Sequence, residues 1–473
     1  MVLRFDMATD EQQITLTVFV NKTKNCVAFV ESDLDFVDAL LSFLTLPVGT
    51  VVHLLNKQSS LGCFDKLYQG VDQLDMKYLV TATCKSMLTN PVNSSGLKCQ
   101  KLRINIDEMG ELYACIYESC ANRKFSYYSS AKCVCGGGMH KAISHDLKQY
   151  YVNYEELQGV FVKGDKFAVT DALSIASIED AMSSDDWGYG DWSNMEERLV
   201  KIDRAQVLDI LKRSLISDTP LTDVLLQNGE DTAPKLSVPP IGKTGAIKVF
   251  DKEKKIYRIK LALTRNKVLY AVSSQDLVDV IFSFLTFPLG TLKKHLGSRF
   301  PIGCLNNLYG SAERLASSGY VVAGCEERLL NPKLAPYFNC KDQVIGVEEE
   351  QQDVYYACSS CCKLSATSYV CIEHLKGGEA QQQELIDCKG HPGQSESSYG
   401  SYCKELMYMI SDELVVTPLS LTGAVLLRKE FCEPVKMAEL GIGEAEALDL
   451  LSVALSSKTA LTDAFFARAN FGG

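Results

Sequence analysis

The feature that most constrains the fold is an internal repeat. The stretch Phe43-Leu-Thr-Leu-Pro-Val-Gly-Thr50 returns 241 residues later as Phe284-Leu-Thr-Phe-Pro-Leu-Gly-Thr291, and the same shift carries Gly62-Cys63 to Gly303-Cys304. Solenoid repeats are only about 20–50 residues long, so this period indicates two whole domains. We predict domains over 12–228 and 254–469, joined by a Gly/Pro-punctuated linker over 229–253 and packed with pseudo-twofold symmetry.

The pattern within one copy predicts an α+β fold, with helices and strands in segregated runs. Alternating apolar residues predict a hairpin over 14–20 and 26–30, a second hairpin over 102–106 and 112–117, and a strand over 159–169. A helix is expected to end at Pro47, with a new one starting at Gly49. An amphipathic helix is expected over 203–215.

Charge and cysteine usage limit the partners and the compartment. The chain has 48 basic and 59 acidic residues, a formal charge of −11 that disfavours nucleic acid as the main partner. The apolar stretch 36–55 contains Asp38, Pro47 and His53, so we expect a buried helix rather than a membrane span. The first residues do not resemble a secretory signal, and 18 cysteines without one indicate reduced thiols. We therefore expect a cytoplasmic or nuclear protein that is not secreted.

Two cysteine clusters carry the strongest chemical signal. The first is Cys115-x4-Cys120-x12-Cys133-x-Cys135, followed by three glycines. Four soft thiolates on two tight turns suit a tetrahedral zinc ion, so we predict a small zinc ribbon over about 113–140. A closed four-cysteine site leaves no open coordination position, which predicts a structural metal. The alternative is a group of reduced, unligated thiols.

The second cluster is a degenerate version of the first, over about 356–392. At the 241-residue shift, Cys120 corresponds to Cys361 and Cys133 to His374. The ligand set that we predict here is Cys358, Cys361, Cys371 and His374. Cys388 and His391 form a competing pair, so the choice between His374 and His391 stays open.

The sequence signal for catalytic residues is weaker than the signal for the cysteine clusters. Asp38 and Asp279 recur at the repeat shift, and paired carboxylates across an interface can act as acid and base. A repeated helix-face or capping role is the better interpretation. His53 and His295 occupy similar places in the two copies, and a packed structural role is again the simpler one. No catalytic residue is assigned.

The repeated motif resembles the plant family catalogued as domain of unknown function 674. The resemblance rests on Ser-Phe-Leu-Thr-x-Pro-x-Gly-Thr in both copies, the Cys133-Val-Cys135-Gly-Gly-Gly-Met139 turn and the Thr-x-Leu-Thr-Asp tail. It implies a duplicated plant protein without an assigned activity. Two functions then compete. One is a zinc-stabilised interaction or scaffold protein, related to stress or defence, with a protein partner and an acidic loop bearing Trp187 and Trp192. The other is a metabolic enzyme or small-molecule binder with a pocket between the repeats, for which Asp38, Asp279, His53 and His295 are the residues to test.

Overall fold

The structure is a computed structural model of the chain. It describes residues 13–107, 110–117, 120, 123–143, 158–183, 194–226, 255–340, 343–351, 355–358, 364–365, 380–390, 400–423, 425 and 434–471. We call its residues up to 226 the N-terminal half and those from 255 the C-terminal half. Helices and three sheets are present, so the prediction of a mixed α+β fold is confirmed. The predicted linker lies outside the described residues, and the division into two domains stays a prediction.

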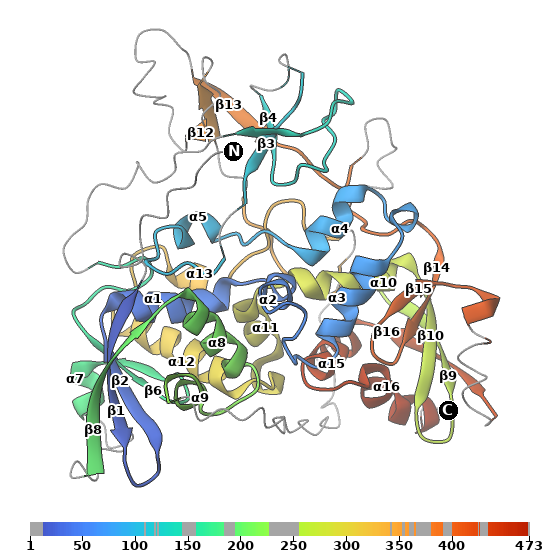
Figure 1. Cartoon of the computed structure of the whole chain (residues 1–473). Helices are drawn as coiled ribbons and strands as arrows, with labels where there is room; N and C mark the ends of the chain where they lie inside the picture. Colours follow the sequence, from blue (N-terminus) through green and yellow to red (C-terminus); the bar gives the residue numbers. More distant parts are fainter. Residues whose placement is uncertain are drawn as a thin grey trace, which may run out of the picture.

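Two five-stranded antiparallel sheets have the same strand order. The first is ordered β7-β6-β2-β1-β8 and the second β15-β14-β10-β9-β16. Figure 1 shows them at opposite ends of the molecule, with helices between them. The strands of the first are β1 (Ile14–Asn21), β2 (Cys26–Ser32), β6 (Phe167–Thr170), β7 (Ile175–Ser177) and β8 (Met195–Ile202). Those of the second are β9 (Tyr257–Leu263), β10 (Val268–Ser274), β14 (Met407–Ser411), β15 (Val416–Pro418) and β16 (Lys436–Ile442).

The first hairpin forms as its alternation predicts. Ile14, Leu16, Val18 and Val20 all lie buried on one face of β1, because successive side chains of a strand point to opposite faces. The turn that follows is closed by the Asn21 side chain, which accepts from the backbone N–H groups of the next turn residues. These contacts fix the pairing of β1 with β2.

Each half contains the broken helix that its proline predicts. In the N-terminal half, α1 (Leu34–Ser42) begins at the Asp33 cap, continues as a 3-10 turn (Phe43–Thr45) and gives way to α2 (Val48–Leu54) after Pro47. In the C-terminal half, the equivalents are α10 (Gln275–Ser283), the turn Phe284–Thr286 and α11 (Leu289–Leu296). Proline has no N–H and ends the preceding helix.

The two broken helices cross at their prolines. Pro47 and Pro288 form an antiparallel bridge, in which the Val48 N–H donates to the Phe287 carbonyl and the Leu289 N–H to the Leu46 carbonyl, each at 3.0 Å. Glycine follows in both copies because the backbones approach too closely for a side chain. A Cβ on Gly49 would lie 3.0 Å from the Leu285 carbonyl oxygen of the other half, and a Cβ on Gly290 would lie 3.0 Å from the Leu44 carbonyl oxygen. The Pro-x-Gly-Thr motif therefore marks the contact between the halves.

The halves also exchange a helix. The α3 helix (Phe64–Gln73) belongs to the N-terminal half, yet the N–H and thiol of Cys63 at its start donate to the Ala454 and Ser457 carbonyls, both at 2.9 Å. Reciprocally, α12 (Gly303–Ser317) packs against β7 and α1, and its Ser311 hydroxyl accepts from the Ile175 N–H at 2.8 Å. Figure 1 shows α12 beside the sheet of the N-terminal half and α3 towards the other one.

The remaining helices complete one continuous apolar core, which extends from Ile14 to Phe465 across both halves. A helix with an Asp203 capping box matches the one expected over 203–215. These helices are α4 (Ala82–Thr89), α5 (Gly96–Cys99), α7 (Ile178–Ser183), α8 (Arg204–Ser214), α9 (Pro220–Leu225), α13 (Glu326–Leu330), α15 (Glu444–Ala454) and α16 (Ala460–Phe471).

A third sheet joins strands of both halves. Its order is β12-β11-β13-β4-β3-β5, and the parallel pairing of β13 with β4 links the two sets. In Figure 1 this sheet lies above the helical layer. Its strands are β3 (Leu112–Ala114), β4 (Lys124–Ser126), β5 (Lys141–Ile143), β11 (Tyr355–Cys358), β12 (Leu364–Ser365) and β13 (Ala380–Leu385). We call the described residues of 112–143 the cysteine ribbon.

One predicted strand is wrong, and another is shorter than predicted. Residues 102–106 alternate in burial but form turns, because the Arg204 guanidinium, rather than a neighbouring strand, binds the carbonyls of Asn105 and Ile106. Their expected partner, β3, pairs with β4 and β5 instead. The predicted strand over 159–169 starts only at Phe167, because the N–H groups of residues 160–162 bind the Asp38 carboxylate.

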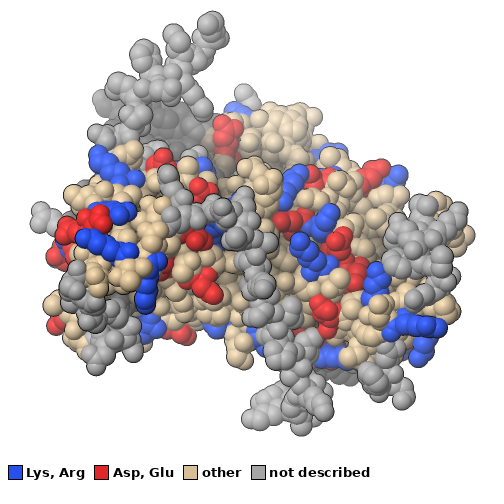
Figure 2. All heavy atoms as spheres, turned by 60° about the horizontal axis from the view of Figure 1, so that its bottom comes forward, with Lys and Arg blue, Asp and Glu red and all other residues tan. Residues whose placement is uncertain are grey.

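The distribution of surface charge and the lengths of the helices are relevant to binding of nucleic acid and of membranes. Acidic and basic side chains are interspersed over the face shown in Figure 2. Within the described residues, no helix combines the length and the apolar character needed to span a bilayer.

The exchange predicts that neither half folds alone. The α12 helix buries Leu305, Leu308 and Leu315, each worth about 1.5–3 kcal/mol, and a domain's whole stability is about 5–15 kcal/mol. Residues 1–228 and 229–473, expressed separately, should show no cooperative thermal unfolding by circular dichroism. Coexpressed, they should elute together as a one-to-one complex. Cooperative unfolding of either isolated fragment as a monomer would contradict this prediction.

Candidate metal centre

The cysteine ribbon places four cysteines on two turns. Cys115 follows β3 directly, and the Ile116 N–H donates to the Gly138 carbonyl at 3.0 Å, which ties the first turn to the second. Cys133 and Cys135 lie on a tight turn closed by the Cys133 N–H on the Gly137 carbonyl, at 2.8 Å. The pairing of β3 with β4 and β5 therefore holds the two turns against each other.

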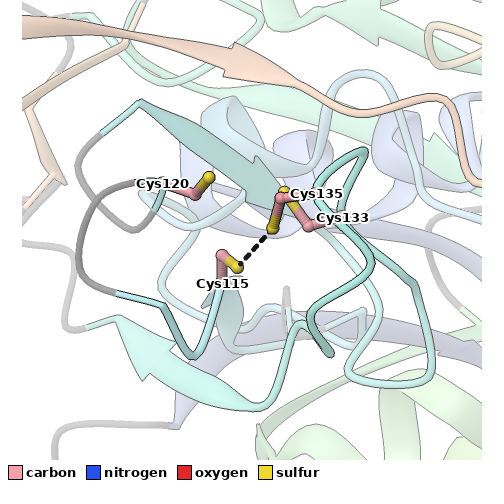
Figure 3. Close-up of side chains that lie close together, drawn as sticks. All are labelled: Cys115, Cys120, Cys133 and Cys135. Carbon is pink, nitrogen blue, oxygen red and sulfur yellow. Dashed lines mark hydrogen bonds between the residues drawn. The ribbon is translucent and has the colours of Figure 1, made fainter. Parts of the chain in front are cut away.

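The four sulfur atoms form one compact group. All of them lie within 4.8 Å of one another, and the sulfurs of Cys115 and Cys135 are 3.5 Å apart (Figure 3). A tetrahedral zinc ion with Zn–S bonds of about 2.3 Å places its sulfurs about 3.8 Å apart, so the sulfur–sulfur distances need only small adjustments to fit. No disulfide joins any of these four thiols. The first predicted cluster is therefore brought together and can hold a metal ion.

Glycines give the second turn its shape. Gly136 has φ of +87°, a conformation that side chains other than hydrogen disfavour. A Cβ on Gly137 would lie 2.9 Å from the Cys115 sulfur and 2.7 Å from the Tyr117 ring. The glycines after Cys135 thus allow the turn to pack closely against the cysteine cluster.

The four thiols differ in exposure and in acidity. Cys115 and Cys133 are buried, Cys120 is half-buried and Cys135 is exposed. Burial raises the pKa of Cys115 and of Cys133, whereas the Gly137 backbone N–H lowers the pKa of Cys135 to about 7. Because the thiolate is the form that binds metal, Cys135 provides a ligand that ionises more readily than the buried Cys115 and Cys133.

The second predicted cluster cannot be placed. Cys361, Cys371, His374 and His391 lie outside the described residues, and only the backbone of Cys358 is described, at the end of β11. The Cys388 side chain is buried, and its sulfur lies 3.4 Å from the Ser126 hydroxyl of the cysteine ribbon. Trp187 and Trp192 are also outside the described residues. The ligand set Cys358, Cys361, Cys371 and His374 stays a prediction.

Asp38 and Asp279 organise two equivalent loops. Asp38, buried on α1, accepts backbone N–H bonds from Phe161 at 2.9 Å and Val162 at 3.0 Å, and from Val160. Asp279, buried on α10, accepts from Tyr402 and Cys403 at 3.0 Å each. Each carboxylate serves its own loop, which supports the helix-face interpretation over acid–base chemistry.

These two loops bridge the halves. The Phe161 carbonyl accepts from the Val322 N–H at 2.8 Å, and the Tyr402 carbonyl accepts from the Val80 N–H at 2.9 Å. Each buried carboxylate thus positions a loop of its own half that binds the backbone of the other half.

The two histidines are not brought to these carboxylates. His53 is exposed, and its Nδ1 lies 3.2 Å from the Tyr68 hydroxyl. His295 is half-buried, and burial lowers its pKa. Both lie on the last turn of their helices, α2 and α11, away from the loops that occupy Asp38 and Asp279.

The sequence did not predict the burial of the charged residue Lys389. Lys389 is buried, its ammonium donates to the carbonyls of Asn339 and Gly400, and it lies 4.8 Å from the Tyr402 ring centre. Its charge acts on Asp279, whose pKa burial nevertheless raises to about 7. No local pattern around Lys389 signals this burial, because its partners are carbonyls distant in sequence.

Fold and site together define a mixed α+β protein with two matching sheets and a ribbon that carries a four-thiol cluster. The family model described as "Protein of unknown function (DUF674)" matches residues 10–433, and the chain belongs to this family. The resemblance seen in the repeated motif is thereby confirmed. No significant match was found among curated proteins or among solved structures.

The burial of Asp38 predicts a pH dependence of stability. Burial raises its pKa from 3.8 to about 7, so its contribution is fully present below about pH 4 and is lost as the pH rises through 7. We expect the Asp38→Asn variant to gain stability relative to the wild type over this range, by up to about 4 kcal/mol. Urea unfolding at several pH values measures the difference.

The exposed Asp165 supplies the control, since Asp165→Asn should follow the wild type at every pH. A difference between the wild type and Asp38→Asn that does not change with pH would contradict the prediction.

Proposed function

We propose that the protein is a zinc-stabilised interaction or scaffold protein. The observation that carries the proposal is the group of four thiols within 4.8 Å, flanked by exposed apolar side chains. Four thiolates fill the coordination sphere of zinc and leave no position for a substrate, so the metal's role is to hold the ribbon in shape. The proposed ligands are Cys115, Cys120, Cys133 and Cys135.

The surface beside the thiols is suited to a protein partner. Ile116, Tyr117 and Val134 are next to the cysteines in sequence and are 49%, 54% and 62% exposed. Large apolar side chains gathered on an exposed surface favour interaction sites, and aromatic residues are enriched at such contacts. A metal-held ribbon presents these side chains at low entropic cost, because the turns are already ordered.

We also propose that the halves are tandem copies related by pseudo-twofold symmetry. The identical strand order of the two sheets supports this, as do the reciprocal bonds at Pro47 and Pro288. A second zinc site at Cys358, Cys361, Cys371 and His374 belongs to the same proposal and rests on sequence spacing. A role in plants, in stress or defence, rests on the family resemblance.

The competing proposal is an enzyme or small-molecule binder with a pocket between the halves. An open hollow of about 720 Å³ between β6–β7 and α12 favours it. This hollow is lined by Asp180, Glu313 and Arg314, but by none of Asp38, Asp279, His53 and His295. Since the candidate acid–base residues do not converge there, the interaction proposal is the better supported.

The proposal predicts that partner binding depends on the ribbon surface and its metal. With full-length protein as bait in an extract of its native tissue, Val134→Asp should reduce partner recovery more than about tenfold, because it places a charge in the contact. Cys133→Ser should do the same through loss of metal. Leu199→Asp is the matched control, since Leu199 is 73% exposed on β8, away from the ribbon.

Quantitative mass spectrometry of the recovered proteins measures the effect. Partners recovered equally well by the wild type and by a folded Val134→Asp variant would contradict the proposal.

A further inference from the structure

A second hollow lies within the N-terminal half, between α4–α5 and the cysteine ribbon. It is open to solvent and holds about 340 Å³, room for a small molecule. Its floor is ordered by the Tyr128 hydroxyl, which donates to the Asn90 carbonyl at 2.9 Å. The chemistry of its lining comes mainly from Asn90, Asp107, Glu111, Tyr113 and Tyr127.

The position that keeps the hollow open differs between the halves. Gly96 lines it, and a Cβ there would meet only the Asn93 Cβ, at 3.8 Å. The residue 241 positions later is Tyr337, whose side chain packs against the small core of the third sheet. Likewise, Asn93 of the hollow corresponds to the buried Leu334. The C-terminal half thus has the tyrosine ring of Tyr337 in place of Gly96 and the apolar side chain of Leu334 in place of the Asn93 amide.

The lining favours positive charge. It contains the carboxyl groups of Asp107 and Glu111, and none of its residues is lysine or arginine. Burial raises the pKa of Asp107 to about 6, an effect partly offset by the Asn93 side chain and by Arg204. Arg204 does not line the hollow and donates to the carbonyls of Asn105 and Ile106. An anion would therefore be repelled, while a cation would gain two carboxylate partners.

The tyrosines that line the hollow further limit the chemical class of its ligand. Tyr113 on β3 and Tyr127, the residue after β4, are half-buried and line the same hollow. Aromatic faces attract ammonium groups and pack against carbon chains. We propose that this hollow binds a small organic cation, a diamine whose ammonium groups are held by Asp107 and Glu111 and whose carbon chain packs against Tyr113 and Tyr127. Part of its lining belongs to the cysteine ribbon, but it includes none of the four cysteines and none of Ile116, Tyr117 and Val134.

The test uses putrescine as the probe and its neutral analogue butanediol as the matched ligand. Isothermal titration of the full-length protein, with its native metal, should show saturable one-site binding of putrescine and none of butanediol. Gly96→Tyr, which introduces the residue of the other half, should weaken putrescine binding more than about tenfold. Asp107→Asn should do the same by removing one of the two carboxylate partners.

Two control variants separate the hollow from general attraction to an acidic protein. Asp165→Asn removes an exposed acid elsewhere, and Gly346→Tyr adds a ring where a Cβ meets nothing within 4 Å; both should bind putrescine like the wild type. If Gly96→Tyr fails to fold, Asp107→Asn and Glu111→Gln, which keep side-chain size, carry the test. No saturable putrescine binding, equal binding of butanediol, or full retention in Asp107→Asn would overturn the proposal.

Discussion

Two backbone hydrogen bonds, from Val48 to Phe287 and from Leu289 to Leu46, determine how the halves of this protein meet. They require a proline that ends each helix and a glycine that lets the backbones approach, which accounts for the repeated Pro-x-Gly-Thr motif. Once the halves cross here, α3 and α12 lie against the opposite half and the core becomes continuous. The loops on Asp38 and Asp279 then close the same contact on both sides.

The cysteine ribbon joins this core through Tyr128, Ala131 and Met139, which pack in it together with Cys115 and Cys133. Among the described residues, the third sheet adds a core of its own with six buried residues, and so small a core supplies little stability by itself. Small structures of this kind need a further constraint, such as a disulfide or a metal. The four neighbouring thiols of the ribbon are in position to supply it. The metal proposal thus follows from the distribution of apolar burial as well as from the cysteine spacing.

The sequence predicted features that depend on local pattern. Proline located the break between the two helices, alternation located the first hairpin, and cysteine spacing located the thiol group. The prediction failed where residues distant in sequence determine the local structure. Residues 102–106 alternate like a strand, but the Arg204 guanidinium donates to the carbonyls of Asn105 and Ile106. The exchange of α3 and α12, the buried Lys389 and the hollow beside Gly96 could not be read from the chain, because each depends on which segments pack together.

The central claim is that a metal ion completes the four-thiol group, and zinc K-edge X-ray absorption on protein purified without chelator tests it most directly. We expect bound zinc with a shell of four sulfur atoms at about 2.3 Å. This shell should be lost in a variant that lacks Cys115 and Cys133. It should be kept in the control Cys26→Ser, which changes a cysteine of β2. A second site with one imidazole would add a minor nitrogen contribution that survives in the first variant. Protein that is folded and free of zinc, or zinc coordinated mainly by oxygen, would contradict it.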